Sequence, residues 1–155
     1  MKILMVCLGN ICRSPLAEGI LQKKAADAGL DWIIDSAGTN GYHNGEHPHP
    51  LSQKVAMQHG INITKQISRS FVKEDFDRFD KIYAMASDVL EDIRYIAKEK
   101  FDDEKALLLL DEVFPGQRKE VPDPWSKPET EYHKVFDLLN KTCDQIINKF
   151  KKQPV

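Results

Sequence analysis

Short apolar runs alternate along this chain with longer segments in which apolar residues recur every three or four positions. The first run, residues 2–7, leads directly into Leu8-Gly9-Asn10, which is typical of a buried strand that enters a tight loop. A helix is predicted to follow from Ser14-Pro15, because Ser suits the helix cap and Pro suits the first helical position. Its apolar residues recur at helical spacing as far as Gly29, where the helix is expected to stop.

The same alternation continues to the end of the chain. Further strands are expected at residues 32–36, 81–85 and 106–110, and further helices at 50–59 and at about 88–98. The last helix is predicted to bury one apolar face, which is formed by Tyr132, Val135, Phe136, Leu139, Cys143, Ile146, Ile147 and Phe150.

Strands that alternate with helices predict an α/β fold in which a parallel sheet is covered on both faces. We therefore expect residues 1–155 to form a single domain, with a doubly wound four-stranded parallel sheet and helices on both faces. In such sheets, ligands bind beyond the carboxyl ends of the strands. Residues 7–14 follow the first strand at that edge, and the long irregular stretch 111–129 is expected to lie over the same rim.

Composition narrows the classes of function. The formal net charge of -2 leaves no basic footprint for nucleic acid, and no apolar run is long enough to span a membrane. The first apolar run is short and is soon interrupted by Gly9 and Arg13, so a cytoplasmic location is expected rather than a signal peptide. Three cysteines without a C-x-x-C pair argue against a disulfide framework and a zinc site, and favour a working thiol.

Residues 7–14, Cys-Leu-Gly-Asn-Ile-Cys-Arg-Ser, combine three features that suit a phosphate group. Gly9 and Asn10 tolerate left-handed backbone angles, so successive N–H groups can turn inward as an anion nest. The helix N-terminus adds free N–H groups and the positive end of its dipole. Arg13 adds a planar cation that matches two phosphate oxygens, so the loop needs neither a metal ion nor a cofactor.

The same positive field acts on Cys7. A thiol beside a helix N-terminus and a guanidinium ionises more readily, and the thiolate is the nucleophilic form. The hydroxyl of Ser14 is a candidate to hydrogen-bond this thiolate and to help the sulfur leave. A buried cysteine that merely ends a strand is the alternative, but the position of Cys7 six residues before Arg13 favours the nucleophile.

The eight residues 7–14 resemble the phosphate-binding loop of the low-molecular-weight protein tyrosine phosphatases. Residues 35–39, Asp-Ser-Ala-Gly-Thr, resemble the second-strand segment of that family, and residues 121–124, Val-Pro-Asp-Pro, resemble its acid loop. The order and spacing of the three segments match over nearly the whole chain. The resemblance implies a cysteine-dependent phosphomonoesterase that acts on a phosphotyrosine protein or a small aryl phosphate and releases inorganic phosphate.

The resemblance also implies roles for individual residues. Cys7 is the expected nucleophile that forms a phosphocysteine, and Asp123 the general acid and then the general base. Ser36 is expected to help hold Asn10, and Tyr42 and Trp125 to wall an aryl cleft, although ordinary partial burial explains these two aromatic residues equally well. The full predicted site contains Cys7, Leu8, Gly9, Asn10, Ile11, Cys12, Arg13, Ser14, Ser36, Tyr42, Asp123 and Trp125. A monomer that binds neither membrane nor nucleic acid is expected.

Two further groups of residues carry competing interpretations. By resemblance, Cys12 is a candidate disulfide partner for Cys7, and packing is the alternative. Cys143 lies on the apolar face of the last helix, so packing is favoured there. His43, His47 and His49 invite a metal interpretation, but they lack carboxylate or cysteine partners at useful spacing, so no metal site is predicted.

The match has four departures from the usual family pattern. Ala86 stands where family members usually carry Asp, and Gln66 stands where many carry His. The family's Asp-Pro-Arg is replaced by residues 49–51, His-Pro-Leu, and Trp125 replaces a Tyr. None of these changes removes a proposed catalytic group, so they bear on supporting hydrogen bonds and on substrate preference.

Four other functions remain as alternatives. An arsenate reductase on this fold needs further thiols, and here only Cys143 lies beyond the loop. Protein-arginine phosphatases typically carry Thr where Ile11 stands, and an apolar Ile11 better suits an aryl phosphate. Sugar-transport components that form a phosphocysteine have no need of an acid such as Asp123. A non-catalytic module that binds phosphate or a phosphoprotein would not require the intact set of Cys7, Arg13, Ser14 and Asp123.

Overall fold

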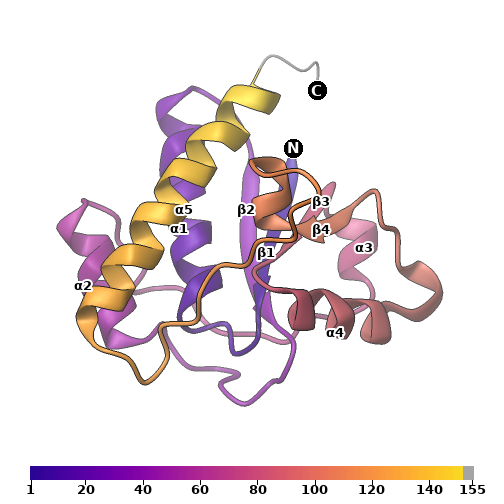
Figure 1. Ribbon diagram of the computed structural model, residues 1–155, viewed down its shortest axis with the longest axis horizontal. Coiled ribbons are helices and arrows are strands. Elements are labelled where there is room, and N and C mark those ends of the chain that lie inside the picture. The colour runs from indigo at the N-terminus through magenta and orange to yellow at the C-terminus, as the bar shows by residue number, and fades with distance from the viewer. Residues whose placement is uncertain (152–155) are drawn as a thin grey trace.

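The computed structural model describes residues 1–151 and has a four-stranded parallel sheet at its centre (Figure 1). The strands are β1 (Lys2–Cys7), β2 (Ile33–Gly38), β3 (Lys81–Ala84) and β4 (Ala106–Leu108), in the spatial order β2-β1-β3-β4. The order reverses between β1 and β3, and every pair is parallel. The predicted α/β fold with a four-stranded parallel sheet is therefore confirmed.

The sheet is covered on both faces because β1 is apolar on both. Ile3 and Met5 belong to one hydrophobic cluster, and Leu4 and Val6 belong to the other, as the alternation of side chains along a strand requires. All four side chains are fully buried. A central parallel strand thus reads as a continuous apolar run, which is the pattern that the sequence shows.

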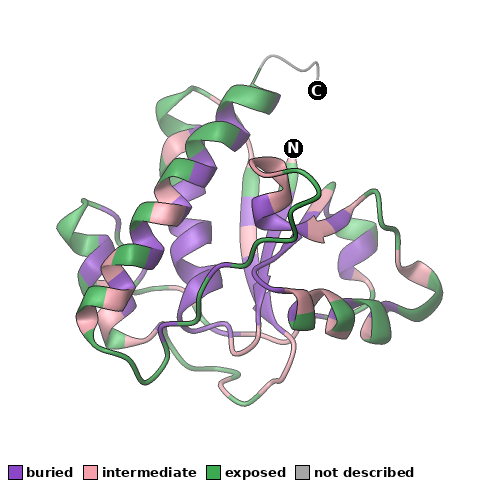
Figure 2. Cartoon of the chain, viewed as in Figure 1, coloured by how far each residue is buried: buried purple, intermediate pink, exposed green. Residues whose placement is uncertain are grey.

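The helices divide between the two faces (Figure 2). On one face, α1 and α5 pack together and α2 packs against both, and on the other face α4 packs against β3 and β4, with Phe76 of α3 in the same cluster. The helices are α1 (Arg13–Asp27), α2 (Pro50–Gln58), α3 (Asp75–Arg78), α4 (Ser87–Ala97) and α5 (Glu129–Phe150), with 3-10 turns η1 (Lys98–Lys100) and η2 (Leu109–Glu112). None of the helices within residues 1–151 has both the length and the apolar character needed to cross a membrane.

The first helix begins earlier than predicted. Its first residue is Arg13 and its cap is Cys12, so Ser14 is not the cap and Pro15 is the third helical residue. The prediction of a Ser14 cap was wrong because the Ser14 hydroxyl contacts the sulfur of Cys7 instead of a backbone N–H. The second helix behaves as predicted, since Pro50 is its first residue.

The fourth strand is shorter than predicted, because the apolar run 106–110 leaves the sheet after Leu108 and continues as η2. Leu109 and Leu110 are nevertheless buried, so burial alone does not distinguish a strand from a 3-10 turn. The irregular stretch after η2 returns to the rim of the sheet, where the Val121 N–H donates to the Met85 carbonyl, just beyond β3 (2.8 Å).

Candidate active site

The segment from Cys7 to Arg13 joins β1 to α1 at the point where the strand order reverses. Asn10 has a left-handed backbone with φ of 58°, and its N–H donates to the Cys7 Sγ atom at 3.2 Å. The backbone therefore curls around the sulfur, as the nest interpretation of this loop requires. We call residues 7–13 the phosphate loop.

Gly38, the last residue of β2, lies directly against the phosphate loop. A Cβ atom at this position would lie 2.9 Å from the Leu8 carbonyl oxygen and 3.0 Å from the Gly9 carbonyl carbon, so no larger residue fits without a shift of the loop. The next residue, Thr39, donates its N–H to the Cys7 and Leu8 carbonyls at 3.1 and 2.9 Å. The end of the second strand thus supports the loop.

Cys7 is almost completely buried, and its sulfur lies 3.0 Å from the Ser14 Oγ atom. Asn10 organises the surroundings of this pair. Its side-chain amide donates to the Ser14 Oγ at 2.8 Å and to the Ser36 Oγ at 2.9 Å, and its Oδ1 accepts the Arg69 N–H at 3.0 Å. The structure therefore places Ser36 against Asn10 and Ser14 against Cys7, the positions in which each was expected to act.

Glu18 extends this network and was not predicted from the sequence. Its Oε1 accepts the Ser36 hydroxyl at 2.6 Å and its Oε2 accepts the Gln22 side-chain amide at 3.0 Å. Burial raises the pKa of Glu18 to about 7, against the lowering effect of the Ser36 hydrogen bond. One signal was available: Glu18 follows Ser14 by four residues, so the two share one helix face.

Arg69 braces the network from outside. Its guanidinium lies between the carboxylates of Asp35 and Asp75, at 3.0 and 3.2 Å, and Asp75 is fully buried. These contacts fix the backbone whose N–H binds the Asn10 side chain. Gln66, one of the departures from the family pattern, donates to the Pro15 carbonyl at 3.1 Å, and its buried Oε1 has no partner among the described residues.

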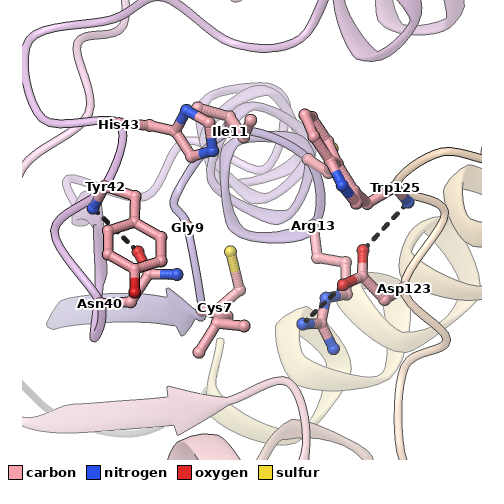
Figure 3. Close-up of a pocket in the computed structure, with 11 residues that line it drawn as sticks. Cys7, Gly9, Ile11, Arg13, Asn40, Tyr42, His43, Asp123 and Trp125 are labelled. Carbon is pink, nitrogen blue, oxygen red and sulfur yellow. Dashed lines mark hydrogen bonds and ion pairs between the residues drawn. The ribbon is translucent and has the colours of Figure 1, made fainter.

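Arg13 and Asp123 meet on the other side of the sulfur (Figure 3). Arg13 is buried, donates to the Val121 carbonyl at 3.1 Å and lies 3.6 Å from the Asp123 Oδ2 atom. The Asp123 side chain is 46% exposed, and its Oδ1 accepts the backbone N–H of Trp125 at 3.1 Å. The carboxylate is therefore held at both oxygens and still reaches solvent.

A cavity of about 310 Å³ opens above Cys7. Its walls come from the loop after β2 on one side and, on the other, from residues 121–126, which contain the predicted Val-Pro-Asp-Pro segment and are called the acid loop from this point on (Figure 3). The residues that line it are Cys7, Leu8, Gly9, Ile11, Cys12, Arg13, Asn40, Tyr42, His43, Asp123 and Trp125. Tyr42 and Trp125 thus both line the cavity, and Asn40 and His43 are lining residues that sequence reasoning missed.

The other two cysteines have different surroundings. Cys12 lies beside the Tyr132 hydroxyl at 3.7 Å, and burial raises the pKa of its thiol to about 12. Cys143 is fully buried within α5, where burial raises its thiol pKa to about 12. Both thiols are therefore protonated at neutral pH, and Cys143 has the environment of a packing residue.

The three histidines of the segment after β2 point to different partners. His43 Nδ1 lies 2.9 Å from the Glu46 carboxylate, and His47 Nδ1 lies 3.0 Å from the Gln66 carbonyl oxygen. His49 Nδ1 accepts the Leu51 N–H and so caps α2. Across residues 1–151, no three His, Cys, Asp or Glu side chains are grouped so as to hold a metal ion.

The chain has a parallel sheet, with a Cys-x5-Arg loop at the point where the strand order reverses. These features place it among the α/β proteins that carry a cysteine in a loop of the phosphate-binding kind. A family model described as low molecular weight phosphotyrosine protein phosphatase matches residues 2–155, and the chain belongs to this family. The expected family, and with it the expectation of a phosphatase enzyme, is confirmed.

Individual relatives agree with this assignment. The low molecular weight protein-tyrosine-phosphatase YfkJ of Bacillus subtilis is 36% identical over 154 residues, which cover 98% of this chain and 97% of the relative. A protein tyrosine phosphatase from Entamoeba histolytica, solved with Hepes in its active site, has a TM-score of 0.88 and 36% identity over 98% and 97% of the two chains. The YwlE arginine phosphatase of Bacillus subtilis has a TM-score of 0.90 and 25% identity over 99% and 97%.

Proposed function

We propose that this protein hydrolyses phosphotyrosine and other aryl phosphates through a phosphocysteine on Cys7. One observation carries the proposal: the Cys7 sulfur is held by the Ser14 hydroxyl and the Asn10 N–H at the floor of a cavity whose wall presents Arg13 and Asp123. A nucleophile, an oxyanion clamp and a carboxyl group thus face one space. The names of YfkJ and the Entamoeba histolytica enzyme support a tyrosine phosphatase activity.

In the first step, the Cys7 thiolate attacks phosphorus, a sulfur–phosphorus bond forms and the bond to the aryl oxygen breaks. Protonated Asp123 gives its proton to the departing oxygen, because its half-exposed carboxyl lies at the cavity wall. The phosphate-loop N–H groups and Arg13 hold the equatorial oxygens, where charge is greatest in the transition state.

In the second step, water attacks the phosphocysteine and the sulfur–phosphorus bond breaks. Asp123, now ionised, takes a proton from the water, and inorganic phosphate forms. The Ser14 hydroxyl and the Asn10 N–H stabilise the sulfur as it regains its negative charge. The chain's own residues therefore supply every proton transfer in this scheme.

The shape of the cavity favours an aryl ester. Tyr42 and Trp125 present flat side chains at its mouth, and apolar Ile11 lines its wall. A slot of this kind stabilises an aromatic ring by stacking, and it lets the phosphate group of an aryl ester reach the phosphate loop. The structural similarity to the YwlE arginine phosphatase makes phosphoarginine the second candidate, and Ile11 offers no polar partner for a guanidinium.

The test is hydrolysis of p-nitrophenyl phosphate and of a phosphotyrosine peptide by the wild type, Cys7→Ser and Asp123→Ala. We expect nearly complete loss of turnover in Cys7→Ser, and in Asp123→Ala a slowing of about 100-fold or more that is greatest for poor leaving groups. Turnover of phosphoarginine but not of the aryl ester would favour the arginine phosphatase. Phosphate binding without any turnover would indicate a binding module. The cytoplasmic location and the monomeric state stay predictions.

A further inference from the structure

The acid loop that carries Asp123 is attached to the phosphate loop through aromatic rings. The Trp125 ring lies 5.7 Å, centroid to centroid, from the His49 ring in an edge-to-face arrangement. It lies at the same distance from the His43 ring, with the planes tilted by 53°. Trp125 is 49% exposed, so one side of the indole faces solvent and the other meets the two imidazoles.

His49 is itself firmly held. Its backbone N–H donates to the Ile11 carbonyl of the phosphate loop at 2.8 Å, and its ring stacks on the buried ring of Tyr132, 5.2 Å away with the planes 27° apart. Burial lowers the pKa of His49 from its usual 6.5, which keeps the ring neutral at neutral pH, with Nδ1 free to accept the Leu51 N–H. The imidazole is therefore a fixed platform beside the phosphate loop.

His43 is held in a similar way. Its Nδ1 contacts the Glu46 carboxylate, and its Cδ2 would lie 3.1 Å from a Cβ atom on Gly9, so its ring lies over the phosphate loop. Figure 3 shows His43 and Trp125 facing each other across the mouth of the cavity. The two histidines come from one segment, and both lie against the phosphate loop as well as Trp125, His49 at Ile11 and His43 at Gly9.

These contacts form a continuous ring of interactions that starts at the phosphate loop, passes through His49, Trp125 and Asp123, and returns to the loop at Arg13. The Ile11 carbonyl of the phosphate loop accepts the backbone N–H of His49, and the His49 ring packs on the Trp125 ring. The backbone N–H of Trp125 donates to one oxygen of Asp123, and Arg13 of the phosphate loop faces the other oxygen at 3.6 Å. We infer that His49, assisted by His43, is a positioning residue that holds Trp125 and thereby keeps the Asp123 carboxyl beside the leaving group. This inference rests on the proposed role of Asp123 as general acid.

Positioning of the acid and lining of the substrate cleft are two different roles, and their loss has different effects on the reaction. A misplaced acid slows esters whose leaving oxygen needs a proton, whereas it has little effect on esters that leave as stable anions. A lost wall weakens binding of all aryl esters alike. The informative measurement is the single-turnover rate of aryl release from phenyl phosphate, a poor leaving group, compared with 2,4-dinitrophenyl phosphate, a good one.

The variant to test is His49→Asn, because Asn retains an oxygen acceptor for the Leu51 N–H at the start of α2 and removes only the ring. We expect its rate with phenyl phosphate to fall about tenfold while its rate with 2,4-dinitrophenyl phosphate stays within about twofold of the wild type. His49→Phe keeps a ring and is expected to restore most of the phenyl phosphate rate. His47→Ala is the matched control, since His47 belongs to the same segment and binds the Gln66 carbonyl instead.

A double substitution makes the test decisive. In an Asp123→Ala background, His49→Asn is expected to cause no further selective loss with phenyl phosphate, because the group that it positions is absent. Equal losses with both esters, or a full additional loss in the Asp123→Ala background, would overturn the inference and leave the proposed function standing. If Asp123→Ala itself shows no dependence on the leaving group, the proposed role of Asp123 fails and this inference fails with it.

Discussion

Glu18 should make the stability of this protein depend on pH. It is 7% exposed, and it accepts hydrogen bonds from the neutral side chains of Ser36 and Gln22. Burial and the neighbouring Asp35 raise its pKa from 4.5 to about 7, although the hydrogen bonds from Ser36 and Gln22 and the charge of Arg69 act in the opposite direction. Replacement by Gln keeps an oxygen acceptor for the Ser36 hydroxyl and removes the titration.

The sign of the effect follows from proton binding. Between about pH 4.5 and pH 7, the folded protein retains on Glu18 a proton that the unfolded chain releases, so the free energy of unfolding falls as the pH rises through this window. Below the window both states are protonated and the contribution is fully present. Above it both are ionised and the contribution is lost, which at about 1.4 kcal/mol per pH unit amounts to about 3 kcal/mol.

Urea unfolding of the wild type and Glu18→Gln at pH 5 and pH 8 measures this contribution directly. Because every other titrating group is common to both proteins, the difference between their unfolding free energies isolates Glu18. We expect Glu18→Gln to gain about 2 to 3 kcal/mol relative to the wild type between the two pH values. Glu91→Gln, at an exposed position of α4, is the control and should show no such change. A constant difference between wild type and Glu18→Gln across the range would refute the reasoning.

Three further predictions follow from the phosphate loop and its surroundings. Gly38→Ala places a methyl group 2.9 Å from the Leu8 carbonyl oxygen and should weaken competitive inhibition by inorganic phosphate at least about tenfold, which unchanged inhibition would contradict. Ser14→Ala removes the hydroxyl beside the Cys7 sulfur and should lower kcat about 10- to 100-fold with little change in KM; stopped-flow traces with kcat unaltered would exclude this role. Cys143→Ala should lower the free energy of unfolding by about 1 to 3 kcal/mol without changing turnover of the folded enzyme, and a loss of turnover at unchanged stability would count against a packing role.

The periodicity of apolar residues predicted the fold because most strands and helices bury their side chains in one simple pattern, on both faces for a central strand and on one face for a helix. The first strand is buried on both faces and starts and ends as predicted, and the last helix buries the face that its spacing indicates. The errors lie where two structures satisfy the same pattern. Leu109 and Leu110 are as apolar as the strand before them, yet they form a 3-10 turn that still buries both side chains. Short α3 was missed for a similar reason, since four residues carry too little periodicity to indicate a helix.

The start of α1 shows how a site overrides a local preference. Ser before Pro is a strong helix-start signal, but the helix begins at Arg13 and the Ser14 side chain turns to the Cys7 sulfur and the Asn10 amide. The backbone groups that a Ser cap would satisfy are thereby left for another acceptor, which is the condition for binding an anion. A missing cap at this position is therefore consistent with the phosphate-binding role that the sequence motif indicates.

The sequence motif identifies the phosphate loop, but apart from Ser36 it does not identify the residues that support the loop. The loop is held by the Thr39 and Arg69 N–H groups and by the Val121 carbonyl, which come from three segments far apart in the chain. Backbone groups are the same in every residue, so these contacts leave almost no mark on the choice of amino acid. Gly38 is the exception, because there the close approach of two backbones excludes a Cβ atom. The support of a catalytic loop can thus be inferred from sequence only where contact restricts the side chain.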